Sequence, residues 1–146
     1  MSVEVKICGV NSEPALEAAI ENGARYVGFN FFPPSPRFVQ AKEAAALSAR
    51  VAGGPLRVGL FVDPTIEDIA AVVADLKLDI LQLYGKSLPL ADIKARFGLP
   101  IWRPIGVETA ADLPADNGGA DALLMEAKPP PRAGSTLATR TSEVSD

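Results

Sequence analysis

Two hydrophobic patterns alternate along the chain, and each predicts a different kind of element. Short apolar runs, rich in branched side chains, are typical of strands. They lie at 3–8, 26–31, 56–62, 79–84, 99–105 and 121–127. Between them, apolar residues recur every three or four positions, as in helices with one buried face. These helical segments are 12–22, 41–51, a stretch that begins after Thr65, and 90–97, and a further short helix is expected over 108–113.

Proline, glycine and capping residues predict where the helices begin and end. Pro14 lies in the first turn of the first predicted helix, and Gly23 lies just past its last turn. Thr65 and Asp68 have the spacing of a capping box, and Gly98 ends the fourth predicted helix. The apolar face expected on the third helix consists of Ile66, Ile69, Ala70, Val73 and Leu76.

Near-continuous apolar strands that alternate with helices predict a parallel sheet covered on both faces. Such α/β units in series allow a (β/α)8 TIM barrel or an open doubly wound sheet. The chain has no G-x-G-x-x-G and no P-loop motif, so we favour the barrel. After Lys128 the pattern stops. We therefore expect residues 1–128 to form an incomplete barrel of about six βα units, with the last two missing, and 129–146 to be a disordered or unrelated tail.

Composition excludes several classes of function. Apolar residues make up 48% of 146 positions, enough for one domain with a core, and the net charge of −4 argues against a nucleic-acid partner. No apolar run approaches the ~18 residues of a membrane span. The single cysteine predicts a reducing, cytoplasmic location. The chain has no histidine, which removes Ser-His-Asp and Cys-His sites and nearly all catalytic zinc sites, and its lack of nucleotide-binding motifs disfavours a nucleotide cofactor.

Active sites of βα barrels lie where the strands end, and this rule selects candidates directly. Cys8 ends the first predicted strand, Arg37 follows the second, and Glu126 lies at the end of the sixth. The same rule selects Asp63, Gln82, Tyr84, Arg103 and Lys128. Each candidate has a simpler interpretation: Cys8 as a small core side chain, Arg37 as a surface cation, and Glu126 as a solvated carboxylate. A thiol and a carboxyl group in one pocket could nevertheless isomerise a substrate by moving protons alone.

Five motifs together resemble one family, the phosphoribosylanthranilate isomerases of tryptophan biosynthesis. They are K-I-C-G (6–9), V-G-F-N-F-F-P-P-S-P-R-F (27–38), V-G-L-F-V-D (58–63), L-Q-L-Y-G (81–85) and L-L-M-E-A-K (123–128). Their order and spacing agree over roughly residues 3–130. The resemblance implies a (β/α)8 barrel that converts a small aminoaldose phosphate into an aminoketose phosphate by an Amadori rearrangement, with no metal or cofactor.

The resemblance also implies roles for three residues. Cys8, in the K-I-C-G motif, would be the general base that takes the proton from C2 of the ribose. Glu126 would be the general acid that protonates the ring oxygen as the furanose opens. Arg37, in the S-P-R loop, would hold the anthranilate group, because a guanidinium suits both a carboxylate and an aromatic face.

Three departures from the family pattern predict an impaired activity. Glu126 stands where the family has aspartate, Tyr84 stands where it has histidine, and the glycine-rich phosphate turn of the last two units is absent. A barrel without those units would leave two open strand edges, so we expect self-association through these edges. A non-catalytic partial barrel that serves as a folding or interaction module is the alternative from another class, and a different sugar-phosphate isomerase is a third interpretation.

Overall fold

The computed structural model describes residues 2–128, which form one six-stranded parallel sheet with the strand order β1-β2-β3-β4-β5-β6. The strands are β1 (Lys6–Cys8), β2 (Tyr26–Asn30), β3 (Leu56–Val62), β4 (Ile80–Tyr84), β5 (Ile101–Val107) and β6 (Ala122–Ala127). The helices are α1 (Glu13–Glu21), α2 (Ala41–Ala49), α3 (Ile66–Asp75) and α4 (Leu90–Phe97), and η1 (Ala110–Asp112) is a single 3₁₀ turn.

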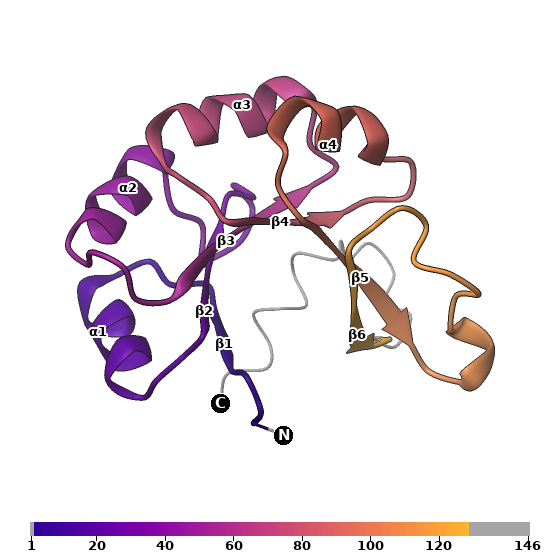
Figure 1. The fold of residues 1–146 in the computed structure, drawn as a ribbon, viewed down its shortest axis with the longest axis horizontal. Coiled ribbons are helices and arrows are strands. Elements are labelled where there is room, and N and C mark those ends of the chain that lie inside the picture. The colour runs from indigo at the N-terminus through magenta and orange to yellow at the C-terminus, as the bar shows by residue number, and fades with distance from the viewer. Residues whose placement is uncertain (1, 129–146) are drawn as a thin grey trace.

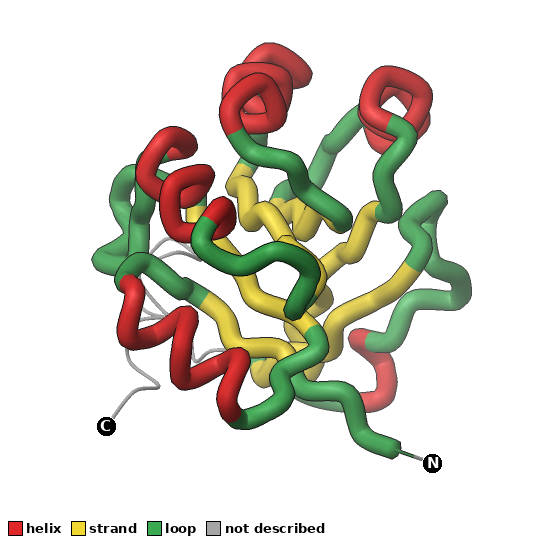
Figure 2. The backbone as a smooth tube through the Cα atoms, turned by 60° about the vertical axis from the view of Figure 1, so that its left-hand side comes forward, coloured by secondary structure: helices red, strands yellow, loops and turns green. Residues whose placement is uncertain are grey.

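The sheet curls, and its helices lie along the outside of the curve. Figure 1 shows α1 to α4 around the convex face, with β1 and β6 at the two ends of the sheet. Figure 2 shows the same separation, with the helices on one side of the strands. The predicted partial barrel of α/β type is therefore confirmed. The tail predicted for 129–146 lies outside the described residues, so the division of the chain at residue 128 stays a prediction.

Alternate side chains of a strand point to opposite faces, and in β2, β3 and β4 both faces are buried, which explains their near-continuous apolar runs. On β4, Leu81 and Leu83 face the helices and are fully buried. Ile80 and Tyr84 face the concave side, where Tyr26 and Trp102 meet edge to face with ring centroids 4.9 Å apart. The concave side is thus a second, smaller core, and it carries the polar residues described below.

The predicted ends of α3 and α4 are confirmed by their capping contacts. The Thr65 hydroxyl accepts from the Asp68 N–H at 3.1 Å, and the Asp68 carboxylate accepts from the Thr65 N–H at 2.8 Å. Gly98 ends α4 with a left-handed φ of 63°. Of the apolar face expected on α3, Ile69 and Leu76 are buried, and the other three residues are only partly buried. Val72, which was not expected on this face, is buried. The short helix expected over 108–113 is only the 3₁₀ turn.

Two aspartates join neighbouring strands at the end of the sheet where the strands begin. The Asp79 carboxylate accepts from the Arg57 N–H at 2.8 Å, and the Arg57 carbonyl accepts from the Asp79 N–H at 2.8 Å. Asp121 and Ile101 repeat this pair of contacts at β5 and β6, also at 2.8 Å. Each carboxylate satisfies a backbone donor that the strand ladder leaves open, so the two aspartates help to fix the strand register.

None of the helices in residues 2–128 has the length and apolar character needed to cross a membrane.

Replacing Asp79 tests this register contact. Asp79→Ala leaves the half-buried Arg57 N–H without its acceptor and should lower the free energy of unfolding by about 1–3 kcal/mol. Asp79→Asn keeps a side-chain oxygen that can accept the same bond, so it should cost less. Urea denaturation of the three proteins measures the difference, and equal stability of wild type and Asp79→Ala would contradict the assignment.

Candidate active site

The Cys8 thiol lies on the concave side of the sheet and not in the core. Lys6 and Cys8 are two positions apart on β1, so their side chains point to the same face of the sheet. The Lys6 ammonium donates to Gln82 on β4 at 2.7 Å, which identifies that face as the concave one. A Cβ on Gly28 would lie 3.3 Å from the Cys8 sulfur and 3.0 Å from Leu60 in the concave core. Cys8 is exposed, so the interpretation as a buried core side chain is wrong.

Gly9 brings the Arg37 side chain to the residue next to Cys8. Gly9 has a φ of +76°, and a Cβ at this position would lie 2.3 Å from Cδ of Arg37. No other residue type fits this combination of a left-handed backbone and a close side-chain approach. The aliphatic stem of Arg37 therefore lies against the backbone that follows Cys8, and the structure brings these two predicted site residues together.

Ser35 holds the loop that presents Arg37. Its side chain is buried, and its hydroxyl oxygen accepts from the Arg37 N–H and from the Asn30 side-chain amide, both at 3.2 Å. The Asn30 side-chain oxygen accepts from the Phe32 N–H at 2.9 Å. These contacts tie the start of the loop to the end of β2. The sequence marks Ser35 only as part of the S-P-R motif. A serine whose hydroxyl can bond to the backbone two residues later is nevertheless typical of a turn that a side chain stabilises.

Glu126 lies on β6, half-buried, and faces the concave side from the other end of the sheet. The Tyr84 hydroxyl donates to its Oε1 atom at 2.9 Å, across the 42 positions that separate the two residues in the chain. Burial, followed by the charge of Glu126 and the bond to it, raises the pKa of Tyr84, and the nearby Cys8 contributes in the same direction. The phenol and the carboxyl group are thus directly paired, on the same face of the sheet as the thiol.

The side chains on this face are called the concave group below: Lys6, Cys8, Gln82, Tyr84 and Glu126. The sequence assigns no role in the site to three of them, Lys6, Gln82 and Tyr84. The strand-end rule selects Gln82 and Tyr84 only by their place on a strand. The resemblance marks Tyr84 as a departure from the family pattern. The signal that could have identified them is the period of two, because Lys6 shares a face with Cys8 and Gln82 shares a face with Tyr84.

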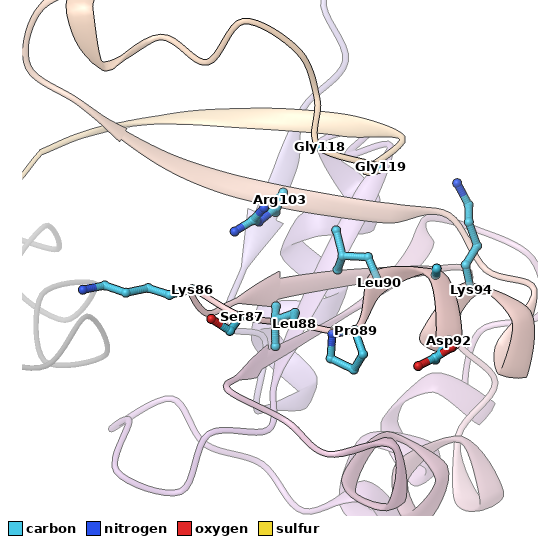
Figure 3. A pocket seen from close by; sticks show the side chains of 11 residues that line it. Lys86, Ser87, Leu88, Pro89, Leu90, Asp92, Lys94, Arg103, Gly118 and Gly119 are labelled. Carbon is cyan, nitrogen blue, oxygen red and sulfur yellow. The ribbon is translucent and has the colours of Figure 1, made fainter.

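A hollow of about 540 Å³ lies apart from these residues, beside the start of α4. Figure 3 shows Lys86, Ser87 and Leu88 on the loop that enters α4, with Arg103 opposite them on β5. Arg103 donates to the Gly85 carbonyl at 3.1 Å. Arg103 is therefore not part of the concave group, although the strand-end rule selected it. No group of three or more acidic, cysteine or histidine side chains in residues 2–128 is arranged to hold a metal ion.

Comparison with known proteins identifies the family to which the chain is similar. The family model described as "N-(5'phosphoribosyl)anthranilate (PRA) isomerase" matches residues 5–125. The N-(5'-phosphoribosyl)anthranilate isomerase of Granulibacter bethesdensis is 51% identical over 134 residues, which cover 91% of this chain and 64% of the relative. The isomerase of Paracoccus denitrificans is 50% identical over 89% of this chain and 63% of its own length. The chain thus spans less than two thirds of these relatives.

Solved structures give the same result. The Thermus thermophilus phosphoribosyl anthranilate isomerase is 29% identical with a TM-score of 0.75, and the match covers 88% of this chain and 64% of that one. A phosphoribosyl anthranilate isomerase in complex with reduced 1-(o-carboxyphenylamino)-1-deoxyribulose 5-phosphate has a TM-score of 0.68 at 29% identity, covering 76% of this chain and 57% of that one. Sequence and fold agree, and the chain belongs to the N-(5'-phosphoribosyl)anthranilate isomerase family.

Proposed function

We propose that the concave group isomerises N-(5'-phosphoribosyl)anthranilate to the carboxyphenylamino-deoxyribulose phosphate, a step of tryptophan biosynthesis. The observation that carries the proposal is the position of Cys8 and Glu126, which face one interior from opposite ends of the sheet with Tyr84 between them. A family relative has been solved in complex with a reduced form of the product, which supports a sugar-phosphate ligand on this fold.

The first step is acid-catalysed ring opening. Glu126, in its protonated form, gives its proton to the ring oxygen of the ribose while the bond from C1 to that oxygen breaks. The lone pair of the anthranilate nitrogen forms a double bond to C1, so the product of this step is a cationic Schiff base. A positioned acid of this kind contributes about 10²–10⁴-fold to a rate.

The second step is removal of the proton from C2 by the Cys8 thiolate. The electrons of the C2–H bond form a double bond between C2 and C1 and neutralise the Schiff base, which gives an enolamine. A proton from solvent then adds to C1 while the C2 hydroxyl releases its proton to solvent, so that C2 becomes the ketone carbon. Both steps move protons only, so they need no redox partner.

Arg37 would orient the anthranilate group beside the base. Its stem is held against Gly9, and its N–H is held by Ser35, so the guanidinium starts from a fixed point next to Cys8. A guanidinium can pair with the anthranilate carboxylate through two parallel bonds. Accurate placement of the substrate matters because an error of about 1 Å can cost about 10²-fold in rate.

The arrangement favours catalysis over the alternative of a non-catalytic interaction module. A module of that kind has no need for an exposed thiol and a half-buried carboxyl group that face the same concave side of the sheet. A thiol that must stay reduced to act as a base also supports the cytoplasmic location that the sequence predicts.

Replacing the thiol tests the proposed base. Cys8→Ser keeps nearly the same shape but replaces the thiol with a hydroxyl, which is a far weaker acid and so a poorer source of an anionic base. We therefore expect kcat/KM to fall about 10²–10⁴-fold with the fold unchanged. The measurement is the conversion of N-(5'-phosphoribosyl)anthranilate by the purified chain, together with growth without tryptophan of a cell that lacks the isomerase. A folded wild-type chain that neither turns over substrate nor restores growth would contradict the proposed function.

Replacing Gly9 tests the placement of Arg37, and Gly23 offers a matched control. Gly9→Ala places a Cβ where Cδ of Arg37 lies, so it should displace the arginine and raise KM by about tenfold, the loss of one charged hydrogen bond. Gly23 has a similar φ of +69° with nothing within 4 Å of the added Cβ. Gly23→Ala should therefore cause a similar backbone strain of about 1–2 kcal/mol and leave KM unchanged. Equal KM values in both variants would contradict the role given to Arg37.

We also propose that the two outer strands of the sheet pair with a second copy of the chain. Among the described residues, β1 and β6 each have one strand neighbour. Apolar side chains are exposed at both, with Val5 48%, Ile7 40% and Met125 53% exposed. Unpaired backbone groups beside exposed apolar side chains are the features that promote strand-to-strand association.

Sedimentation tests this association. The wild-type chain should sediment as a dimer or larger species at micromolar concentration. Ile7→Lys places a charge at the edge of β1 and should shift the chain toward the monomer. A wild-type chain that is monomeric and unfolds in one sharp cooperative transition would contradict the proposed pairing.

A further inference from the structure

Two of the departures from the family pattern contact one another. The sequence resemblance implies an aspartate at position 126 and a histidine at position 84, and in this chain the Tyr84 hydroxyl lies 2.9 Å from Oε1 of Glu126. Each substitution alone would disturb an acid site, since the added methylene moves the carboxyl group and the phenol replaces an imidazole. Their contact indicates that the two substitutions belong together.

The hydrogen bonds that lead to Glu126 have a fixed direction. The Lys6 ammonium can only donate, so the Gln82 side-chain oxygen is the acceptor of the 2.7 Å bond between them. The Gln82 amide nitrogen then points to the Tyr84 hydroxyl at 3.0 Å. Because the hydroxyl oxygen accepts this bond, its single proton is directed to Glu126.

The two donors nearest to Glu126 in this series of hydrogen bonds are more deeply buried than Glu126 itself. Gln82 is 1% exposed and Tyr84 is 7% exposed, both on the central strand β4. Glu126 is half-buried on β6, which pairs with β5 alone among the described residues. A fixed donor on a central strand can therefore define the position of a carboxyl group on an outer strand.

We propose that Tyr84 is a positioning residue that holds Oε1 of Glu126 and thereby leaves Oε2 to carry the proton given to the ring oxygen. This proposal rests on the proposed function, because it assigns a partner to the acid of that reaction. The phenol remains protonated throughout and exchanges no proton with the substrate. Lys6 and Gln82 fix the direction of the phenol and take no direct part in the chemistry.

The bond from Tyr84 strengthens as the reaction proceeds. Before proton transfer its acceptor is a neutral carboxyl group, and afterwards it is a carboxylate, to which hydrogen bonds are roughly twice as strong. A contact that improves between ground state and transition state raises kcat and leaves substrate binding unchanged. The raised pKa of Tyr84 keeps the donor proton in place over the working range of pH.

A double-mutant cycle tests the positioning role in the full chain. Tyr84→Phe should lower kcat about tenfold or more, with little change in KM, as expected for one bond to a charged group. In a Glu126→Gln background, which lacks the acid proton, the same Tyr84→Phe change should have no further effect. An equal fall in both backgrounds, or a fall that lies in KM, would overturn the proposal.

A spectroscopic measurement tests the contact without turnover and without altering Tyr84. The chain has two tyrosines, and each donates to one glutamate: Tyr84 to Glu126, and Tyr26 to Glu4 at 2.7 Å. With tyrosine labelled at the ring carbon that bears the hydroxyl, Glu126→Ala should shift the NMR signal of Tyr84 alone. The matched variant Glu4→Ala should shift that of Tyr26 alone, and Tyr26→Phe assigns the two signals.

The two measurements separate the failure of each proposal. A wild-type chain without turnover contradicts the proposed function, while a Tyr84 signal that responds to Glu126→Ala still supports the contact. A Tyr84 signal that does not respond overturns the positioning role, whether or not the chain is active.

Discussion

The inward curl of a single parallel sheet is the constraint on which the candidate site depends. Cys8 and Glu126 lie on the first and last strands of the strand order, and four further strands lie between them. In a flat sheet these strands would be far apart, at about 4.8 Å for each neighbour. With the helices on its convex face, the curled sheet turns both ends toward one interior (Figure 1). The Tyr84–Glu126 bond is direct evidence that the curl brings β4 and β6 within side-chain reach.

A series of hydrogen bonds from Lys6 to Glu126 lies inside this curve, and it is stable because each polar side chain in it has a hydrogen-bond partner. Val58, Leu60 and Ile80 surround it with apolar side chains, where an unpaired polar group would cost about 1–3 kcal/mol. Every buried side-chain nitrogen and oxygen atom in the described residues has a hydrogen-bond partner. A satisfied network in an apolar setting is rigid, and this rigidity suits residues that must hold an acid in one position.

The sequence predicts the elements well because their signals are local. Thr65 and Asp68 cap α3 through contacts made within three residues, and Gly98 ends α4 through its own backbone. Val72 was missed because the exact rotation of a helix against its sheet depends on packing, which the pattern of α3 alone does not fix. The contact of Gly9 with Arg37 was also missed, because it depends on the path of a loop between two strands.

The parts of the site that the sequence does not predict depend on contacts between residues far apart in the chain. The strand-end rule placed Cys8, Arg37 and Glu126 at one edge of the sheet, but it also selected Arg103, which lies beside another hollow. Which face a side chain takes follows from its register, and register is set by contacts such as that of Asp79 with Arg57. The sequence alone shows Tyr84 only as a departure from the family pattern, because its partner is 42 positions away. The fold shows that Tyr84 and Glu126 meet.

Isotope incorporation during turnover in D₂O tests most directly the claim that Cys8 and Glu126 act together on one substrate. The account predicts that the wild-type chain converts N-(5'-phosphoribosyl)anthranilate to a ketose that carries solvent deuterium at C1, and that Cys8→Ser and Glu126→Gln each abolish this incorporation. A folded chain that forms no labelled product, or variants that form it as fast as the wild type, would contradict the account.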